Sequence, residues 1–87
     1  MADYKIHHVT DKQFELHKDG ENVGFLNHHS TEEKFYLDYV YVEPKHRGKE
    51  IGVKLVEAGL EMAEEKNLKP IPICGYAGSV MRRKGVI

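Results

Sequence analysis

The first half of the chain alternates hydrophobic and polar residues with a period of two, which is typical of β-strands with one buried face. The alternation predicts short strands at residues 4–9, 13–17 and 23–28. Asp19-Gly20 lies between the second and third of these segments and favours a tight hairpin, because glycine readily adopts positive φ. We therefore expect the chain to begin as an antiparallel meander.

A fourth and longer strand is predicted at residues 34–42, after a polar cluster at residues 28–33 that we interpret as a loop. This segment, KFYLDYVYV, is apolar or aromatic on both faces except at Asp38, as expected of a central strand that is covered on both sides. Pro44 cannot continue a central strand, so the chain is expected to leave the sheet there.

The hydrophobic period becomes that of an α-helix from about residue 48 to residue 66, with Asn67 as a candidate left-handed cap. Residues 69–74 then predict a short strand that carries two prolines, and residues 75–84 predict a turn and a short basic helix. The expected order is β-β-β-β-α-β-α, an α+β fold in which the last strand runs parallel to the fourth. We expect one domain over residues 1–87.

The composition favours a cytoplasmic protein. A single cysteine allows no intramolecular disulfide, which suits a reducing compartment. No segment approaches the roughly 20 apolar residues of a membrane span, and the N-terminus lacks the apolar core of a secretory signal. A membrane is therefore not expected as a partner. The six histidines do not have the spacing of a ligand set, so a metal is not expected either.

The two halves of the chain carry opposite charge. Residues 1–43 hold four lysines against nine acidic residues, a net charge of −5, and residues 44–87 have a net charge of +4. One interpretation is ordinary solvated surface, and the other is that the C-terminal half holds an anionic ligand while the N-terminal half faces a cationic partner. Nucleic acid is not expected, because no basic stripe is interleaved with stacking aromatic residues.

An anion site is predicted where the fourth strand gives way to the long helix. The connection is basic and contains Gly48, and the helix that follows presents free N–H groups and a positive dipole end.

The stretch RGKEIG, from Arg47 to Gly52, resembles the acyl-CoA pyrophosphate loop of the GNAT superfamily of N-acetyltransferases. Residues 67–76, NLKPIPICGY, are similar to the Leu-Lys-x-x-Pro-x-Cys-x-Tyr-like signature of a small single-domain subfamily. The similarity runs in order through residues 12–84.

The resemblance implies an acetyl-CoA site in which backbone N–H groups bind the pyrophosphate and the pantetheine arm runs along the fourth strand. The arm enters where the fourth and fifth strands separate, an opening that the prolines at 44, 70 and 72 favour. The cofactor-binding residues implied are Val40, Tyr41, Val42, Arg47, Gly48, Lys49, Glu50, Ile51, Gly52, Val53, Cys74 and Tyr76.

Two departures from the family pattern bear on the site. Glu50 stands where the motif has its first glycine, and its carboxylate either points away from the pyrophosphate or weakens binding. Tyr39 and Val40 stand where the subfamily often has a His-Thr pair, so any role of that histidine is lost.

Three side chains are candidates for chemistry. Cys74 either places its thiol near the thioester, as an acetyl acceptor or as part of the lining, or is a small buried hydrophobe. Asp38 is either a base for the acceptor amine or a solvent-facing acid. Tyr76 is either an acid for the leaving thiolate or a packing residue.

The function implied is transfer of an acetyl group from acetyl-CoA to an unidentified amine. The alternatives are an acyl-CoA-binding or sensing module without turnover, and an interaction domain that has lost the ligand. Full-length superfamily members build the acceptor site from elements that we do not find in this sequence. We therefore expect a shallow acceptor site, one completed by a dimer partner, or none, in a monomer or weak homodimer.

Overall fold

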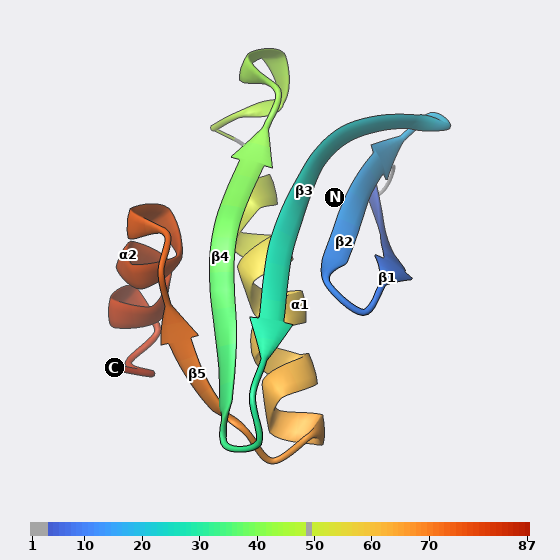
Figure 1. Cartoon of the computed structure of the whole chain (residues 1–87). Helices are drawn as coiled ribbons and strands as arrows, with labels where there is room; N and C mark the ends of the chain where they lie inside the picture. Colours follow the sequence, from blue (N-terminus) through green and yellow to red (C-terminus); the bar gives the residue numbers. More distant parts are fainter. Residues whose placement is uncertain (1–3, 49) are drawn as a thin grey trace.

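The computed structural model describes residues 4–48 and 50–87. It contains a five-stranded sheet in the order β1-β2-β3-β4-β5, with the first four strands antiparallel and β5 parallel to β4 (Figure 1). The α+β fold and its order are confirmed. The elements are β1 (Tyr4–Thr10), β2 (Gln13–Lys18), β3 (Glu21–Ser30), β4 (Lys34–Val42), the 3-10 turn η1 (Pro44–His46), α1 (Ile51–Glu65), β5 (Lys69–Pro72) and α2 (Gly75–Arg83).

The turns follow the local sequence. Asp19 has a φ of 52° and Gly20 a φ of 84°, and two successive positive φ values define the two-residue hairpin predicted between β2 and β3. Asn67, with a φ of 58°, is the left-handed residue after α1, as predicted. No helix within residues 4–48 and 50–87 is both long and apolar enough to cross a membrane.

The loop predicted at residues 28–33 is shorter than expected, because β3 continues to Ser30. His28 is only 2% exposed, and its ring centroid lies 5.0 Å from that of Phe14 and 4.9 Å from that of Phe35. The prediction was wrong because it treated His28 as polar, whereas the imidazole packs in the core as an aromatic ring.

Burial also determines the protonation of His28. Desolvation, assisted by the nearby His8, lowers the pKa of His28 from 6.5 to about 4. Neither ring nitrogen has a hydrogen-bond partner within the described part of the chain, an arrangement that disfavours the charged imidazolium. His28 is therefore a neutral core residue at pH 7.

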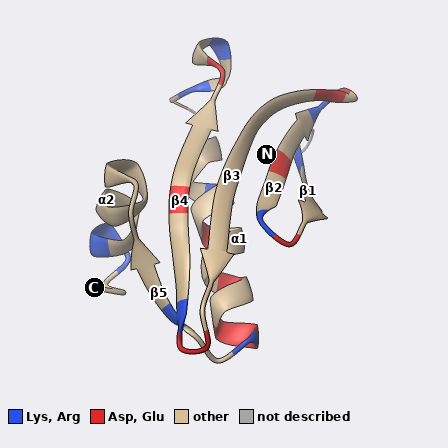
Figure 2. Ribbon diagram, in the orientation of Figure 1, with Lys and Arg blue, Asp and Glu red and all other residues tan. Residues whose placement is uncertain are grey.

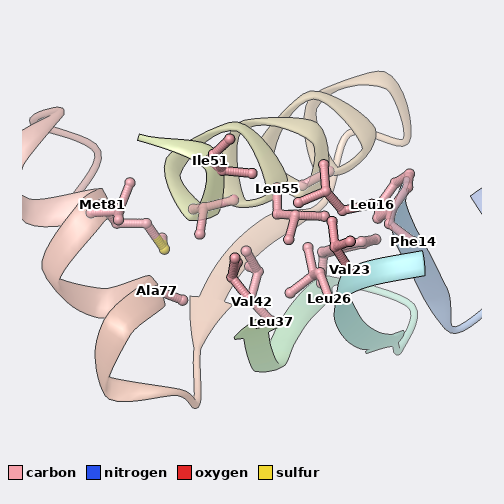
Figure 3. Close-up of a cluster of buried hydrophobic side chains, with 14 residues drawn as sticks. Phe14, Leu16, Val23, Leu26, Leu37, Val42, Ile51, Leu55, Ala77 and Met81 are labelled. Atoms are coloured by element: carbon pink, nitrogen blue, oxygen red, sulfur yellow. The ribbon is translucent and has the colours of Figure 1, made fainter. Parts of the chain in front are cut away.

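β4 is covered on one face only, contrary to the prediction that both faces are covered. Leu37 and Val42 are buried, whereas Tyr39 is 51% exposed. The buried side chains of α1 and α2 form one cluster with those of β4, so both helices cover the same face (Figure 3). The other side of β3 and β4, called the open face below, carries Phe25, His29, Tyr36, Asp38, Tyr39 and Tyr41.

Helix α1 lies close to the sheet. Its buried residues recur at helical spacing between Ile51 and Ala63. A Cβ atom on Gly59 would lie 2.9 Å from the side chain of Leu26 and 3.1 Å from that of Leu37. The absence of a side chain at Gly59 therefore permits the close approach of α1 to β3 and β4.

Candidate functional site

Strands β4 and β5 separate halfway along β4. Their pairing ends at Leu37 and Pro72, and the Leu37 carbonyl accepts hydrogen bonds from the N–H groups of Ile73 at 2.9 Å and Cys74 at 3.2 Å. The chain then turns into α2, so the second half of β4 pairs with β3 but has no strand along its other edge (Figure 1). Pro70 and Pro72 contribute to this opening because they cannot donate to a regular ladder.

A groove with a volume of about 490 Å³ occupies this opening. It lies between the free edge of β4, the N-terminus of α1 and one side of α2. Its lining residues are Tyr39, Val40, Tyr41, Val42, Arg47, Gly48, Glu50, Ile51, Gly52, Val53, Tyr76 and Arg83.

Most of the residues that the sequence suggested for cofactor binding are thus brought together around one groove. Cys74 does not line it, and Lys49 lies outside the described residues. Tyr39 lines it but was not among the implied residues, and Arg83, from the basic C-terminal helix, lines it as well. A signal for Arg83 exists in the sequence, because Arg83 follows Tyr76 by seven residues and so shares its helix face.

The free edge of β4 offers main-chain hydrogen-bonding groups to the groove. The carbonyl oxygen of Tyr41 points towards β3, since a Cβ on Gly24 would lie 2.6 Å from it. Main-chain groups of successive residues point to opposite sides of a strand, so those of Val40 and Val42 point into the groove. This edge can pair with an extended ligand.

The loop before α1 contains two residues with positive φ, Gly48 at 81° and Glu50 at 62°. The first intrahelical bond runs from the N–H of Lys54 to the carbonyl of Glu50, at 3.3 Å. The three N–H groups between them, from Ile51 to Val53, therefore have no partner within the helix. Free N–H groups at a helix N-terminus favour an anion, and these three lie at the groove.

Glu50 is exposed at the rim of the groove, at the N-cap position of α1, and makes no capping hydrogen bond through its side chain. Its left-handed backbone conformation is the one that glycine adopts most easily, which accounts for the glycine at this position in the motif. The side chain of Glu50 therefore does not cap the helix, and Glu50 lies at the groove.

Arg47 contacts the last two residues of β4 at the outer end of the groove. Its Nε donates a hydrogen bond of 2.7 Å to the carbonyl of Val42, and its guanidinium lies 5.6 Å from the centre of the Tyr41 ring. Arg83 adds a positive charge from α2, whose last turn is basic (Figure 2). The groove therefore has a positive rim on two sides.

Tyr76 lies against the first turn of α1. A Cβ on Gly52 would lie 2.7 Å from the Tyr76 hydroxyl oxygen and 3.0 Å from two ring carbons. Burial raises the pKa of Tyr76; the positive charge of Arg83 opposes this shift, and the neighbouring Glu50 and Cys74 add to it. Tyr76 is therefore a protonated hydrogen-bond donor at the groove at neutral pH.

The two residues suggested for catalysis lie next to the inner end of the groove. Cys74 is half-buried at the N-cap of α2, and its side chain packs against the core. Asp38 is the extra residue of a β-bulge, because Tyr39 pairs with Asn27 and Leu37 with His28. Its carboxylate is directed to the open face, and its reactivity, like that of Cys74, stays a prediction.

The family model described as GCN5-related N-acetyl-transferase matches residues 13–86. The chain belongs to this family, as its resemblance to the GNAT superfamily indicated. No curated protein matches the sequence. The Pro-x-Cys-x-Tyr subfamily stays a prediction.

Solved structures confirm the fold at low sequence identity. A ribosomal-protein-alanine N-acetyltransferase from Brucella melitensis biovar Abortus 2308 is 22% identical with a TM-score of 0.69, over 83% of this chain and 61% of that one. Rv2747 from Mycobacterium tuberculosis, in complex with CoA and NLQ, is 20% identical with a TM-score of 0.73, over 85% and 47%. A GNAT family acetyltransferase from Elizabethkingia anophelis with acetyl-CoA bound is 15% identical with a TM-score of 0.69, over 84% and 51%. The matched region thus spans about half to three fifths of each of these chains.

Proposed function

We propose that this protein binds acetyl-CoA in the groove and transfers the acetyl group to an amine. The observation that supports this most is the meeting of an unpaired strand edge and a free helix N-terminus in one groove. Membership of the family supports the same activity, as do the CoA and acetyl-CoA of the two structures named above.

The pyrophosphate is proposed to bind at the N-terminus of α1. The N–H groups from Ile51 to Val53 supply hydrogen bonds, and the helix dipole supplies partial positive charge. Arg83 and the outer end of the Arg47 guanidinium add full charges at the rim. These interactions require no side chain at Gly48, which leaves the backbone open to a phosphate.

The pantetheine arm is proposed to lie along β4. Its two amides pair with the main-chain groups of Val40 and with the N–H of Val42, whose carbonyl already accepts a hydrogen bond from Arg47, as an added strand would. This placement carries the thioester to the inner end of the groove, near the bulge at Asp38. Main-chain N–H groups there can polarise the thioester carbonyl and stabilise the oxyanion of the tetrahedral intermediate.

The transfer step is proposed to be direct attack by a neutral amine on the thioester carbonyl. Direct transfer is supported by the position of Cys74, which does not line the groove. The protein contributes mainly proximity, by holding the thioester at an accessible strand edge. A cytoplasmic location and a monomeric or weakly dimeric state remain our predictions.

The experiment that tests the proposal combines binding and turnover on the same sample. Ligand at 100 times its dissociation constant adds about 2.7 kcal/mol to stability, so acetyl-CoA should raise the melting temperature by roughly 10 °C or more. Release of free CoA thiol in the presence of a lysine-containing peptide then reports transfer. Binding without transfer supports the sensing alternative, and the absence of any shift supports an interaction domain that has lost the ligand.

A further inference from the structure

A histidine and a carboxylate form a hydrogen-bonded pair on the open face of the sheet. The Nδ1 atom of His29, on β3, lies 2.7 Å from Oδ2 of Asp38, on β4. The imidazole also stacks on Tyr36, with ring centres 4.6 Å apart and planes inclined by 6°. Two contacts therefore fix the orientation of the ring.

The second ring nitrogen of His29 is left available. A carboxylate at Nδ1 selects the tautomer in which Nδ1 carries the proton and Nε2 is an acceptor. Within the described residues Nε2 has no hydrogen-bond partner, and the side chain is 48% exposed. The result is a preoriented imidazole with its basic nitrogen facing solvent.

Asp38 lies where β4 and β5 part, and His29 lies next to it on β3, on the other side of β4 from β5. The carbonyl of Leu37 makes the last hydrogen bonds to the segment after β5, and Tyr39 is the first residue of β4 that lines the groove. Asp38 lies between these two residues. The bulge at Asp38 turns its carboxylate to the open face, away from both helices.

We propose that His29 is the general base that receives the proton of the acceptor amine, with Asp38 as its positioning residue. This inference rests on the proposed acetyl transfer. It also assigns a direction of approach, since the amine must enter from the open face, opposite the helices. Histidine is the side chain that most often performs this role in enzymes.

Nε2 of His29 takes one proton from the alkylammonium group, and the neutral amine forms a C–N bond with the thioester carbonyl. When the intermediate collapses, the C–S bond breaks and the second nitrogen proton goes to the departing CoA thiolate. His29 then returns its proton to solvent, so the products are an amide, CoA thiol and one proton.

The class of acceptor follows from the surroundings of the pair. His29 lies on an exposed sheet face, stacked on the ring of Tyr36, rather than in an enclosed pocket. An exposed face suits a primary amine at the end of a flexible chain, and an aromatic ring attracts the ammonium group as it approaches. A lysine side chain in a peptide fits this description.

The structure provides a matched control. Nε2 of His17 and Oε1 of Glu15 form a second His–carboxylate pair at 2.8 Å, on β2 and two strands from the groove. His17→Ala removes the same chemistry from a place where no thioester can reach. Because both alanine variants lose one imidazole, a difference between their rates arises from where that imidazole lies.

The test measures acetyl transfer from acetyl-CoA to a peptide with one lysine, with acetyl-CoA binding measured in parallel. We expect His29→Ala to lower kcat/KM at least 100-fold with unchanged binding, and added imidazole to restore at least tenfold of the loss. Asp38→Asn should lower the rate about tenfold, and His17→Ala less than twofold.

A wild-type protein that transfers acetyl while His29→Ala retains its rate overturns this inference and leaves the proposed function intact. Equal losses in His29→Ala and His17→Ala, or a loss that imidazole does not rescue, also overturn it. A wild-type protein that does not acetylate the peptide overturns the proposed transfer and this inference together.

Discussion

The hydroxyl oxygen of Tyr76 would lie only 2.7 Å from a Cβ atom on Gly52, so the two residues depend on each other across the groove. Tyr76 belongs to α2 and Gly52 to the first turn of α1. The tyrosine can take this position because residue 52 has no side chain. The contact places a hydrogen-bond donor beside the free N–H groups that we assign to the pyrophosphate.

Substitution of Gly52 tests this contact. Gly52→Ala puts a methyl group where the Tyr76 ring lies, and Tyr76 can move because it is 42% exposed. We expect acetyl-CoA to bind at least tenfold more weakly, with a stability change within about 1 kcal/mol, because alanine also favours the helix. Calorimetric titration and urea unfolding measure the two effects.

Gly75→Ala is the control, because an added Cβ at Gly75 meets no atom within 4 Å and its φ is not positive. If both variants bind acetyl-CoA as tightly as the wild type, the groove beside Gly52 is not the binding site.

The side chain of Glu50 is expected to oppose the ligand. Glu50→Gln removes one negative charge from the rim, which at this exposed site should tighten acetyl-CoA binding about two- to fivefold at low salt. Glu50→Gly removes the charge and also relieves the left-handed conformation at φ 62°, so it should add about 1 kcal/mol to stability.

Affinity from calorimetry and stability from urea unfolding separate these contributions. Glu64→Gln, at an exposed position in the last turn of α1, controls for the change in net charge. Weaker binding by Glu50→Gln would show that the carboxylate assists the ligand.

His28 should make the fold sensitive to acid. Its pKa is about 4 when folded and 6.5 in the unfolded reference, so the unfolded chain binds the proton more readily. Its contribution is therefore fully present above pH 6.5 and is lost as the pH falls from 6.5 towards 4, by up to about 3 kcal/mol.

His28→Phe keeps an aromatic ring between Phe14 and Phe35 and removes the titration. The difference in urea midpoint between pH 7.5 and 5 should shrink in this variant. An unchanged difference would assign the acid sensitivity to other groups.

Direct transfer makes the thiol of Cys74 dispensable. Because Cys74 packs against the core and does not line the groove, Cys74→Ala should keep kcat/KM within about threefold. Intact-mass measurement after incubation with acetyl-CoA should find no acetyl adduct. An adduct on Cys74, together with an inactive Cys74→Ala variant, would instead establish a covalent intermediate.

Much of the fold could be predicted because its determinants are local. Asp19-Gly20 and Asn67 adopt the positive φ values that their residue types favour. The burial of His28 could not be predicted, since its place on the helix-covered face depends on how β3 pairs with its neighbours. The single covered face of β4 was missed because its aromatic residues are equally common on exposed sheets.

The residues of the site likewise divide into those that are contiguous in sequence and those that strand pairing brings together. The loop from Arg47 to Gly52 is contiguous in sequence and therefore visible as a motif. The pairing of His29 with Asp38 depends on a bulge between two strands, and no sequence period indicates where an extra residue will be accommodated. Contacts that depend on strand register had to come from the structure.

Calorimetric titration of the wild-type protein with acetyl-CoA, with and without 0.5 M salt, tests whether the groove binds this cofactor. We predict one site per chain, competition by free CoA, and weaker binding in salt, because part of the affinity comes from the charged rim around the pyrophosphate. The absence of binding for both acetyl-CoA and CoA at low salt would contradict this prediction.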